Sequence, residues 1–372
     1  MTQNKRTKKW QPPFYGLWTR VPARLRGWWN KNTWNKLVAT FFAVLIFAVS
    51  GMYGIARWYI YRHSKEPLKL GATFIPDYAV ALGLDPKDTM DAMVNDLGVK
   101  RFRLVSYWEN GEHEQGQYDF SFLDWQFEKA QAAGAEVSLA IGLRQPRWPE
   151  CHTPDWAEKL SKHEWEPQLK NYIKAVVERY RDHPALVSYQ LENEFLLTVF
   201  GDCFDHDRQR LIDEYNLVKS LDSGHTLIVS RSDNAIPSWP VGEPRADLIG
   251  ASIYKRVWDR TITNRYFEYP LPAWYYAFLA GGAELTTGRN TFIHELQAES
   301  WLPDGFSMDD APVEEMYKSI SPERLRKRFS YGVATGMKTL DLWGAEWWYF
   351  MKEKRDNPEL WNTAKEEFDR YQ

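Results

Sequence analysis

Eight short apolar segments of strand length recur along the chain, and most of them are followed by a stretch with helical periodicity. The segments are LGATFI (70–75), KRFRLV (100–105), EVSLAI (136–141), LVSYQL (186–191), HTLIVS (225–230), DLIGASI (247–253), NTFIHE (290–295) and KTLDLW (338–343). Their almost continuous apolar character is typical of parallel strands that are buried on both faces. Strand, crossover helix and strand, repeated eight times over about 300 residues, predict a (β/α)8 barrel, also called a TIM barrel.

The stretches between these strands support that fold class. Residues 121–133 and 167–180 have amphipathic helical patterns, and in the first of them Phe122, Trp125 and Phe127 recur near the helical period. Residues 231–246 hold three prolines and no helical pattern, so one crossover is expected to lack its helix.

An open, doubly wound sheet is the main alternative to a closed barrel. Such sheets usually carry a glycine-rich phosphate loop after the first strand. Here Ile75 is followed by Pro-Asp-Tyr, which has no resemblance to such a loop. The barrel therefore fits the sequence better.

Residues 37–56, LVATFFAVLIFAVSGMYGIA, carry no formal charge. Twenty residues of helix rise about 30 Å, which is the thickness of the hydrocarbon core of a bilayer. Arg57-Trp58-Tyr59 follows, as interfacial residues often do. We expect one transmembrane helix that anchors the protein in the lipid bilayer. A cleavable signal peptide usually has a shorter apolar region nearer the start, and a buried helix of a soluble fold is the other alternative.

Charge is distributed unevenly on the two sides of this segment. Residues 1–36 carry nine Lys and Arg and no acidic residue, so all 50 Asp and Glu of the chain follow them. The positive-inside rule then predicts a basic cytoplasmic tail (1–36), a transmembrane helix (37–56) and a juxtamembrane linker (57–68). A catalytic barrel domain (69–372) would follow outside the cell membrane. An acidic body argues against a nucleic-acid partner.

Functional residues of such barrels gather at the C-terminal ends of the strands. Polar and aromatic groups stand at several of these ends, namely Tyr107-Trp108-Glu109, Glu192-Asn193-Glu194, Tyr254, His294-Glu295 and Trp343. No metal-type cluster of His and Cys competes with them in the sequence, and we expect no cofactor. The two cysteines, Cys151 and Cys203, follow neighbouring strands, whose loops approach closely. A disulfide that braces the rim is one hypothesis, and two free thiols are the alternative.

Two glutamates at these ends suggest a specific chemistry. Cleavage of a glycosidic bond needs one carboxyl group that protonates the leaving oxygen and a second, ionised carboxylate that attacks the anomeric carbon or activates water. Glu194 and Glu295 end the fourth and seventh strands, which lie across the mouth of a barrel from each other. Glu192 is a rival to Glu194, because strand alternation places both on one face. Glu299 is a rival to Glu295.

The segments YQLENEF and FIHELQAESW, together with WENGEHEQGQYDFSFLDWQF (108–127) and DLWGAEWWYF (341–350), resemble the clan A retaining glycoside hydrolases. The resemblance covers about residues 69–372, and families 5 and 42 are the nearest in character. In this superfamily the acid/base is the Glu of an Asn-Glu pair that ends strand four, and the nucleophile is a Glu that ends strand seven. The resemblance therefore implies Glu194 as acid/base and Glu295 as nucleophile.

Further roles follow from the resemblance. Arg103 and Tyr254 would keep Glu295 ionised, although either could instead be structural, Arg103 in an ion pair and Tyr254 packed with its hydroxyl on backbone. Asn193 would bind the sugar 2-hydroxyl. Trp343 would stack on the sugar ring, with Trp347 or Trp348 as the alternative. Trp108 and Glu299 complete the expected substrate-binding set.

The sequence thus predicts a membrane-anchored retaining glycoside hydrolase that acts on β-linked oligo- or polysaccharides by double displacement. Two alternatives remain open. A transglycosylase of envelope polysaccharide would share the same residues, because transfer and hydrolysis differ only in the acceptor. A non-catalytic saccharide-binding barrel would keep the aromatic groove without the chemistry.

Overall fold

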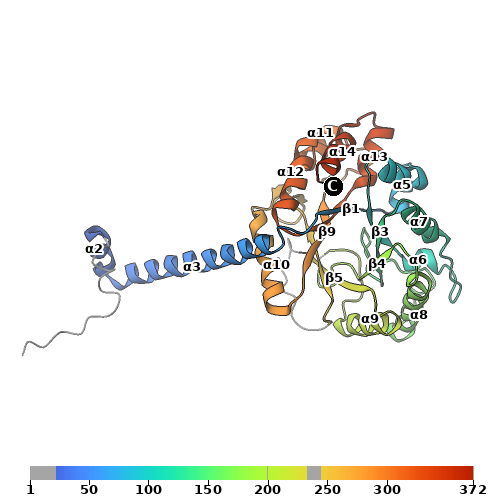
Figure 1. Cartoon of the computed structure of the whole chain (residues 1–372), viewed down its shortest axis with the longest axis horizontal. Coiled ribbons are helices and arrows are strands. Elements are labelled where there is room, and N and C mark those ends of the chain that lie inside the picture. Colours follow the sequence, from blue (N-terminus) through green and yellow to red (C-terminus); the bar gives the residue numbers. More distant parts are fainter. Residues whose placement is uncertain (1–21, 199, 233–243, 372) are drawn as a thin grey trace, which may run out of the picture. The chain divides into compact units, whose positions relative to one another are not determined.

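The computed structural model describes residues 22–198, 200–232 and 244–371. The chain divides into two compact units, Met1–Gly54 and Ile55–Gln372. The second unit, which we call the body, holds all the strands and is shown with its labels in Figure 1.

Eight parallel strands close into a barrel in the body, in the order β1-β10-β9-β6-β5-β4-β3-β2. The strands are β1 (Lys69–Thr73), β2 (Arg101–Val105), β3 (Glu136–Ile141), β4 (Leu186–Leu191), β5 (Thr226–Ser232), β6 (Leu248–Ile253), β9 (Thr291–Gln297) and β10 (Thr339–Trp343). The barrel closes through parallel pairing of β1 with both β2 and β10. The predicted TIM barrel is therefore confirmed, and the open sheet is excluded.

Helices surround the strands (Figure 1). They are α4 (Pro76–Ala81), α5 (Pro86–Asn95), α6 (Trp108–Gly111), α7 (Ser121–Ala132), α8 (Lys162–Tyr180), α9 (Arg208–Leu221), α10 (Ala273–Thr287), α11 (Val313–Ser319), α12 (Pro322–Ala334), α13 (Ala345–Lys354) and α14 (Glu359–Tyr371). Helix α7 illustrates why these helices form and end. Leu123, Phe127 and Ala130 recur on one face, and this apolar face is buried. Gly134, with a positive φ, follows the last turn and ends the helix. No helix is described between β5 and β6, but residues 233–243 of that expected helix-free crossover lie outside the described residues.

A two-stranded antiparallel hairpin, β7 (Arg256–Asp259) and β8 (Arg265–Glu268), extends the loop after β6. No pattern in the sequence predicts this hairpin. Its residues are half-buried or exposed, so they lack the apolar runs that identify the barrel strands.

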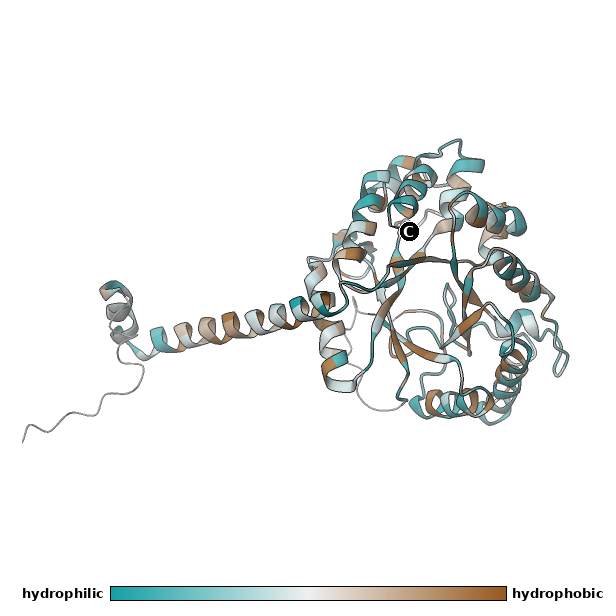
Figure 2. Cartoon of the chain, in the orientation of Figure 1, coloured by the Kyte–Doolittle hydropathy of each residue, from teal (hydrophilic) through white to brown (hydrophobic). Residues whose placement is uncertain are grey.

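In the described residues from 22 onward, two helices precede the barrel, α2 (Ala23–Lys31) and α3 (Thr33–Arg62). Helix α3 contains the apolar segment 37–56, which is coloured largely as hydrophobic in Figure 2. It is the one helix in the described part of the chain that is long and apolar enough to cross a membrane, a judgement that rests on length and composition.

The segment expected as a linker, 57–68, is helical as far as Arg62. The reason is that Ile55 to Arg62 belong to the body and make specific contacts there. Tyr59 is buried and donates a hydrogen bond from its hydroxyl to the carbonyl of Thr291 at 3.2 Å. The Arg62 guanidinium meets Glu284 of α10 at 2.6 Å. These contacts hold residues 55–62 of α3 against the body.

Candidate active site

Glu194 and Glu295 lie at the C-terminal ends of their strands, as the sequence predicts. Glu194 follows β4 by three residues, and Glu295 lies within β9, which continues to Gln297. Both side chains are buried, with relative exposures of 6% and 5%. Burial raises the pKa of Glu194, and the negative charge of Glu295 raises it further. Arg103 binds both Glu295 and Asn193, the residue before Glu194, so the two glutamates belong to one site.

Two donors hold the Glu295 carboxylate. Arg103, from β2, donates from Nη1 to Oε2 at 2.7 Å, and the hydroxyl of Tyr254, just after β6, donates to Oε1. Both oxygens of Glu295 therefore accept a hydrogen bond, one of them charge-assisted. This arrangement compensates the negative charge of the Glu295 carboxylate and fixes its orientation.

Arg103 also connects Glu295 to the end of β4. Its Nη2 donates to Oδ1 of Asn193 at 2.8 Å, and its Nε donates to Oε1 of Gln190 at 2.8 Å. The guanidinium is completely buried. Because a planar guanidinium offers donors in fixed directions, Arg103 sets the positions of Glu295 and Asn193 relative to each other.

Glu194 has a different environment. Its backbone N–H donates to the hydroxyl of Ser230 at 2.8 Å. Burial, followed by the charges of Glu295 and Glu150, raises the pKa of the Glu194 carboxyl from 4.5 to about 8, while a hydrogen bond with Ser252 acts in the opposite direction. Within the described residues, Oε1 of Glu194 has no hydrogen-bond partner. A protonated carboxyl group with one unengaged oxygen is what a general acid requires at neutral pH.

Glu192 points away from this site, so the structure separates it from Glu194. Its carboxylate accepts from the backbone N–H groups of Leu143 and Arg144 at 2.7 and 2.9 Å and from Nη1 of Arg210 at 2.7 Å. Gly142, at φ 109°, makes room for it, because a Cβ there would lie 2.4 Å from Glu192 Oε1. Glu192 is thus a structural carboxylate.

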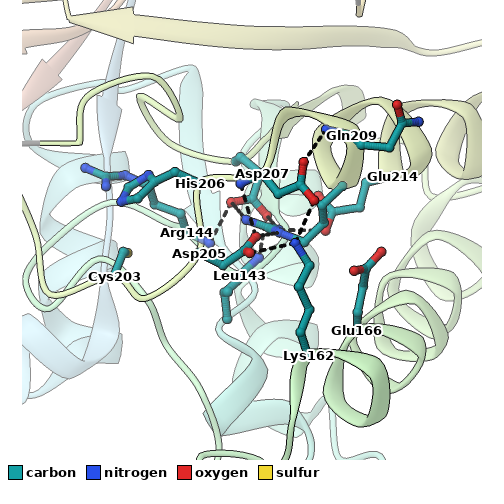
Figure 3. Close-up of polar contacts among 12 residues, drawn as sticks. Leu143, Arg144, Lys162, Glu166, Cys203, Asp205, His206, Asp207, Gln209 and Glu214 are labelled. Carbon is teal, nitrogen blue, oxygen red and sulfur yellow. Dashed lines mark hydrogen bonds and ion pairs between the residues drawn. The ribbon is translucent and has the colours of Figure 1, made fainter.

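Arg210 of α9 joins Glu192 to two further acids, Asp205 and Glu214, each at 2.7 Å. Figure 3 shows Asp205 and Glu214 in this cluster, with Lys162 reaching toward Asp205 and Asp207 at its edge. The cluster ties α9 to the end of β4. It thereby supports the segment that carries Asn193 and Glu194.

Glu299 and Trp343 lie together with a residue that the sequence analysis did not single out. Arg147, from the β3–α8 loop, donates to Glu299 Oε2 at 3.0 Å. Its guanidinium carbon is 4.6 Å from the ring centroid of Trp343 and 3.3 Å from that of Tyr78. The Arg147 guanidinium therefore lies over one face of the Trp343 ring. Glu299 pairs with Arg147 and does not share the donors of Glu295.

The remaining tryptophans have structural surroundings. Trp108 is completely buried, donates from its indole N–H to Glu112 at 2.6 Å and packs edge-on against Trp156. The structure therefore does not bring it to the carboxyl pair. Trp347 and Trp348 are also fully buried, and Trp348 donates to the carbonyl of Ala298 at 2.7 Å.

Glu150 is a third buried carboxyl group of the site, and no local pattern of residues predicts it. Its Oε2 accepts from Nδ2 of Asn193 at 3.0 Å and lies 3.6 Å from Nε of Arg144. Burial raises the pKa of Glu150 from 4.5 to about 7, against the attraction of Arg144. The residue is adjacent to Cys151, which forms the predicted disulfide with Cys203.

No group of three or more His, Cys, Asp or Glu that could hold a metal ion occurs in the part of the chain that the structure describes. The polar groups of the site are carboxyl groups, guanidinium groups, an amide and a phenol. Such a set suits proton transfer and nucleophilic attack by carboxylates.

Comparisons with known proteins show sequence similarity over part of the chain. The family model described as Glyco_hydro_42, Beta-galactosidase, matches residues 87–226. A Beta-galactosidase from Arthrobacter sp is 30% identical over 149 residues, which is 35% of this chain and 21% of that protein. The chain thus matches about a fifth of the length of this curated relative.

Solved structures share the fold at low identity. A GH5_18 from Bifidobacterium longum subsp. infantis is 11% identical with a TM-score of 0.54, covering 82% of this chain and 79% of that one. A Beta-galactosidase from Halorubrum lacusprofundi is 14% identical with the same TM-score, covering 82% and 58%. A GH5_18 from Bifidobacterium longum subsp. longum, in complex with Manb1-4GlcNAc, is 13% identical with a TM-score of 0.54, covering 82% and 78%. Over residues 87–226 the chain is therefore similar in sequence to the Glyco_hydro_42 family, and its barrel shares the fold of the GH5_18 and Beta-galactosidase structures.

Proposed function

From this relation we propose that the protein is a retaining glycoside hydrolase that cleaves β-linked saccharides by double displacement, with Glu194 as acid/base and Glu295 as nucleophile. The observation that carries the proposal is the contrast between the two carboxyl groups. Both oxygens of Glu295 accept from Arg103 or Tyr254, whereas Glu194 has a raised pKa and one oxygen without a partner in the described residues.

The first half-reaction uses each group in the state that its surroundings favour. A carboxylate oxygen of Glu295 attacks the anomeric carbon, and the bond from that carbon to the leaving oxygen breaks. The proton of Glu194 passes to the leaving oxygen, so the aglycone departs neutral. The products are a glycosyl ester on Glu295 and an ionised Glu194.

The second half-reaction follows from the same electrostatics. Once Glu295 is esterified, its negative charge is gone, and that charge was one cause of the raised pKa of Glu194. The pKa of Glu194 then falls, and the ionised group can take a proton from water as the water attacks the anomeric carbon. Glu295 leaves as a carboxylate and Glu194 is protonated again.

Substrate contacts are assigned to the groups around the pair. Asn193 would meet the sugar 2-hydroxyl, a contact that strengthens in the oxocarbenium-like transition state. Arg147, Glu299 and Trp343 would form the wall that receives the rest of the sugar. The Beta-galactosidase relatives make β-galactosides the first substrate class to test, and the Manb1-4GlcNAc complex of a GH5_18 structure adds β-mannosides.

The proposed location is the cell membrane, with α3 as a single-pass anchor, residues 1–36 in the cytoplasm and the barrel outside. The basic composition of residues 1–36 supports this orientation. The Cys151–Cys203 disulfide supports it as well, because disulfides persist in oxidising compartments.

The test uses the full-length chain in detergent with a panel of 4-nitrophenyl β-glycosides, namely galactoside, glucoside and mannoside. We expect turnover of at least one of them, and Glu295→Ala should abolish it. Added azide should then restore turnover in that variant and give the α-glycosyl azide, because azide fills the space of the missing nucleophile. A wild-type chain that turns over none of the panel, or an azide product of β configuration, contradicts the proposed mechanism.

A further inference from the structure

We propose that Glu150 is a positioning residue of the proposed glycosidase site: it holds the Asn193 amide in the one orientation that presents Nδ2 to the 2-hydroxyl of the sugar. The inference rests on the proposed function, since it assigns a role within the same site. It names a third carboxyl group whose effect on catalysis passes through Asn193.

The Asn193 amide is held from both of its ends. On one side Arg103 Nη2 donates to Oδ1 at 2.8 Å, and Gln190 Nε2 donates to the same oxygen at 3.2 Å. On the other side Nδ2 donates to Oε2 of Glu150 at 3.0 Å. A flipped amide would place NH2 against a guanidinium and a carbonyl oxygen against a carboxyl group. Two donors and one acceptor therefore select a single amide orientation.

The selected orientation leaves a hydrogen for the substrate. Nδ2 carries two hydrogens, and Glu150 is its acceptor in the described part of the chain. The second hydrogen is then available to a sugar oxygen. If Glu150 is removed, the amide is held only through Oδ1, and it can rotate about its last torsion, which is broad for asparagine.

The backbone of Asn193 is fixed by the same loop that carries Glu150. Its N–H donates to the carbonyl of Arg144 at 2.6 Å, and its carbonyl accepts from Nε of Arg144 at 2.7 Å. Glu150 is itself 3.6 Å from that Nε atom. The loop between β3 and α8 therefore positions both the main chain and the side chain of Asn193.

A covalent bond holds Glu150 in this place. Cys151 is the next residue, and its disulfide with Cys203 joins the loop after β3 to the loop after β4. The N–H of Asp202 donates to the carbonyl of Pro149 at 2.8 Å. Gly201, at φ 87°, lets the two loops meet, because a Cβ there would lie 2.8 Å from Cγ of Glu150.

The experiment compares two substrates on the full-length chain in detergent: an aryl β-glycoside with its 2-hydroxyl and the matching 2-deoxy glycoside. Glu150→Ala should lower kcat/KM on the 2-hydroxy substrate on the order of 100-fold, the typical cost of a misplaced catalytic contact. On the 2-deoxy substrate, which offers Asn193 nothing to bind, the loss should be much smaller. Glu150→Gln keeps an acceptor oxygen and should recover most of the activity.

The control is Glu158→Ala, an exposed residue of the same β3–α8 connection, which should match wild type on both substrates. An equal loss on both substrates, or no loss in Glu150→Ala, overturns the role of Glu150 while the glycosidase itself stands. A wild-type chain inactive on every aryl β-glycoside overturns the proposed function, and this inference with it. If Glu150→Ala does not fold, Glu150→Asp, which withdraws the carboxyl group from Nδ2, is judged by the same comparison.

Discussion

Replacing Glu194 by Gln should abolish hydrolysis of unactivated substrates and at the same time make the protein more stable at neutral pH. The reason is that folding raises the pKa of this carboxyl from 4.5 to about 8, chiefly by burial. At pH 7 the folded protein keeps the proton, whereas the unfolded chain releases it. Ionisation in the unfolded chain therefore favours unfolding, and a glutamine cannot ionise.

The size and sign of the effect follow from these two pKa values. Below about pH 4.5 both states hold the proton, so the variant gains nothing. Between about pH 4.5 and 8 wild type loses stability steadily, because only its unfolded state releases the proton. At pH 7 the difference amounts to about 3 kcal/mol, or about 5 °C in Tm for a body of this size.

The measurement is thermal unfolding of full-length wild type and Glu194→Gln in detergent. It is made at about pH 5 and about pH 8, because the folded and unfolded states differ in the protonation of Glu194 between these two values. The Tm gain of the variant should be small at the lower pH and largest at the higher one. Glu158→Gln, an exposed control, should show no such trend. A gain that does not change with pH, or a variant less stable than wild type at the higher pH, refutes the assignment of Glu194 as a buried acid that folding keeps protonated.

Three further outcomes follow from the same structure. The kcat/KM of wild type should fall as pH rises through about 8, the pKa of Glu194. For Glu194→Gln, on a substrate whose leaving group needs no protonation, kcat/KM should not fall in this pH range. Replacing Cys151 and Cys203 by Ser should lower the free energy of unfolding by about 4 kcal/mol, the chain-entropy value for cysteines 52 residues apart. Chemical unfolding measures this difference. Two free thiols in unreduced wild type would contradict the disulfide itself. Arg147→Ala should lower the free energy of unfolding by about 2 kcal/mol, because it leaves the carboxylate of Glu299 buried without its cation. Adding Glu299→Gln should recover part of that loss. Additive losses in the double variant would show that the ion pair does not stabilise the fold.

The barrel could be predicted from the sequence because its strands are buried on both faces. All eight expected segments match the observed strands to within two residues at either end. The reason is that a short, continuous apolar run is typical of a parallel strand buried on both faces. The β7–β8 hairpin was missed because its half-exposed residues show no such run. The start of α8 was placed at Pro167 instead of Lys162, although Ser161 and Glu164 form a capping box that marks the true beginning.

The site divides in the same way into residues marked by pattern and residues placed by the fold. Glu295 was visible as an acid that ends an apolar run. Glu150 and Arg147 were not, because their positions depend on a loop with φ values of 77° and 84° at these two residues, and no pattern of residue types specifies such a loop. The nearest signal in the sequence was Cys151, the residue after Glu150. Its disulfide with Cys203 joins two rim loops and restrains the conformation of the loop that carries Glu150.

Glu192 and Glu194, which follow β4, show why strand periodicity could not predict the orientation of their side chains. Alternation along a strand placed Glu192 and Glu194 on one face, but the strand ends at Leu191, and both glutamates have left-handed φ values of 55° and 43°. The alternation rule does not apply to such backbone. Glu192 turns toward Arg210 of α9, which neutralises its charge, while Glu194 turns toward Glu295, which raises its pKa. Two identical side chains two residues apart thus meet different surroundings: Glu192 is paired with a cation, whereas burial first and the charge of Glu295 second raise the pKa of Glu194.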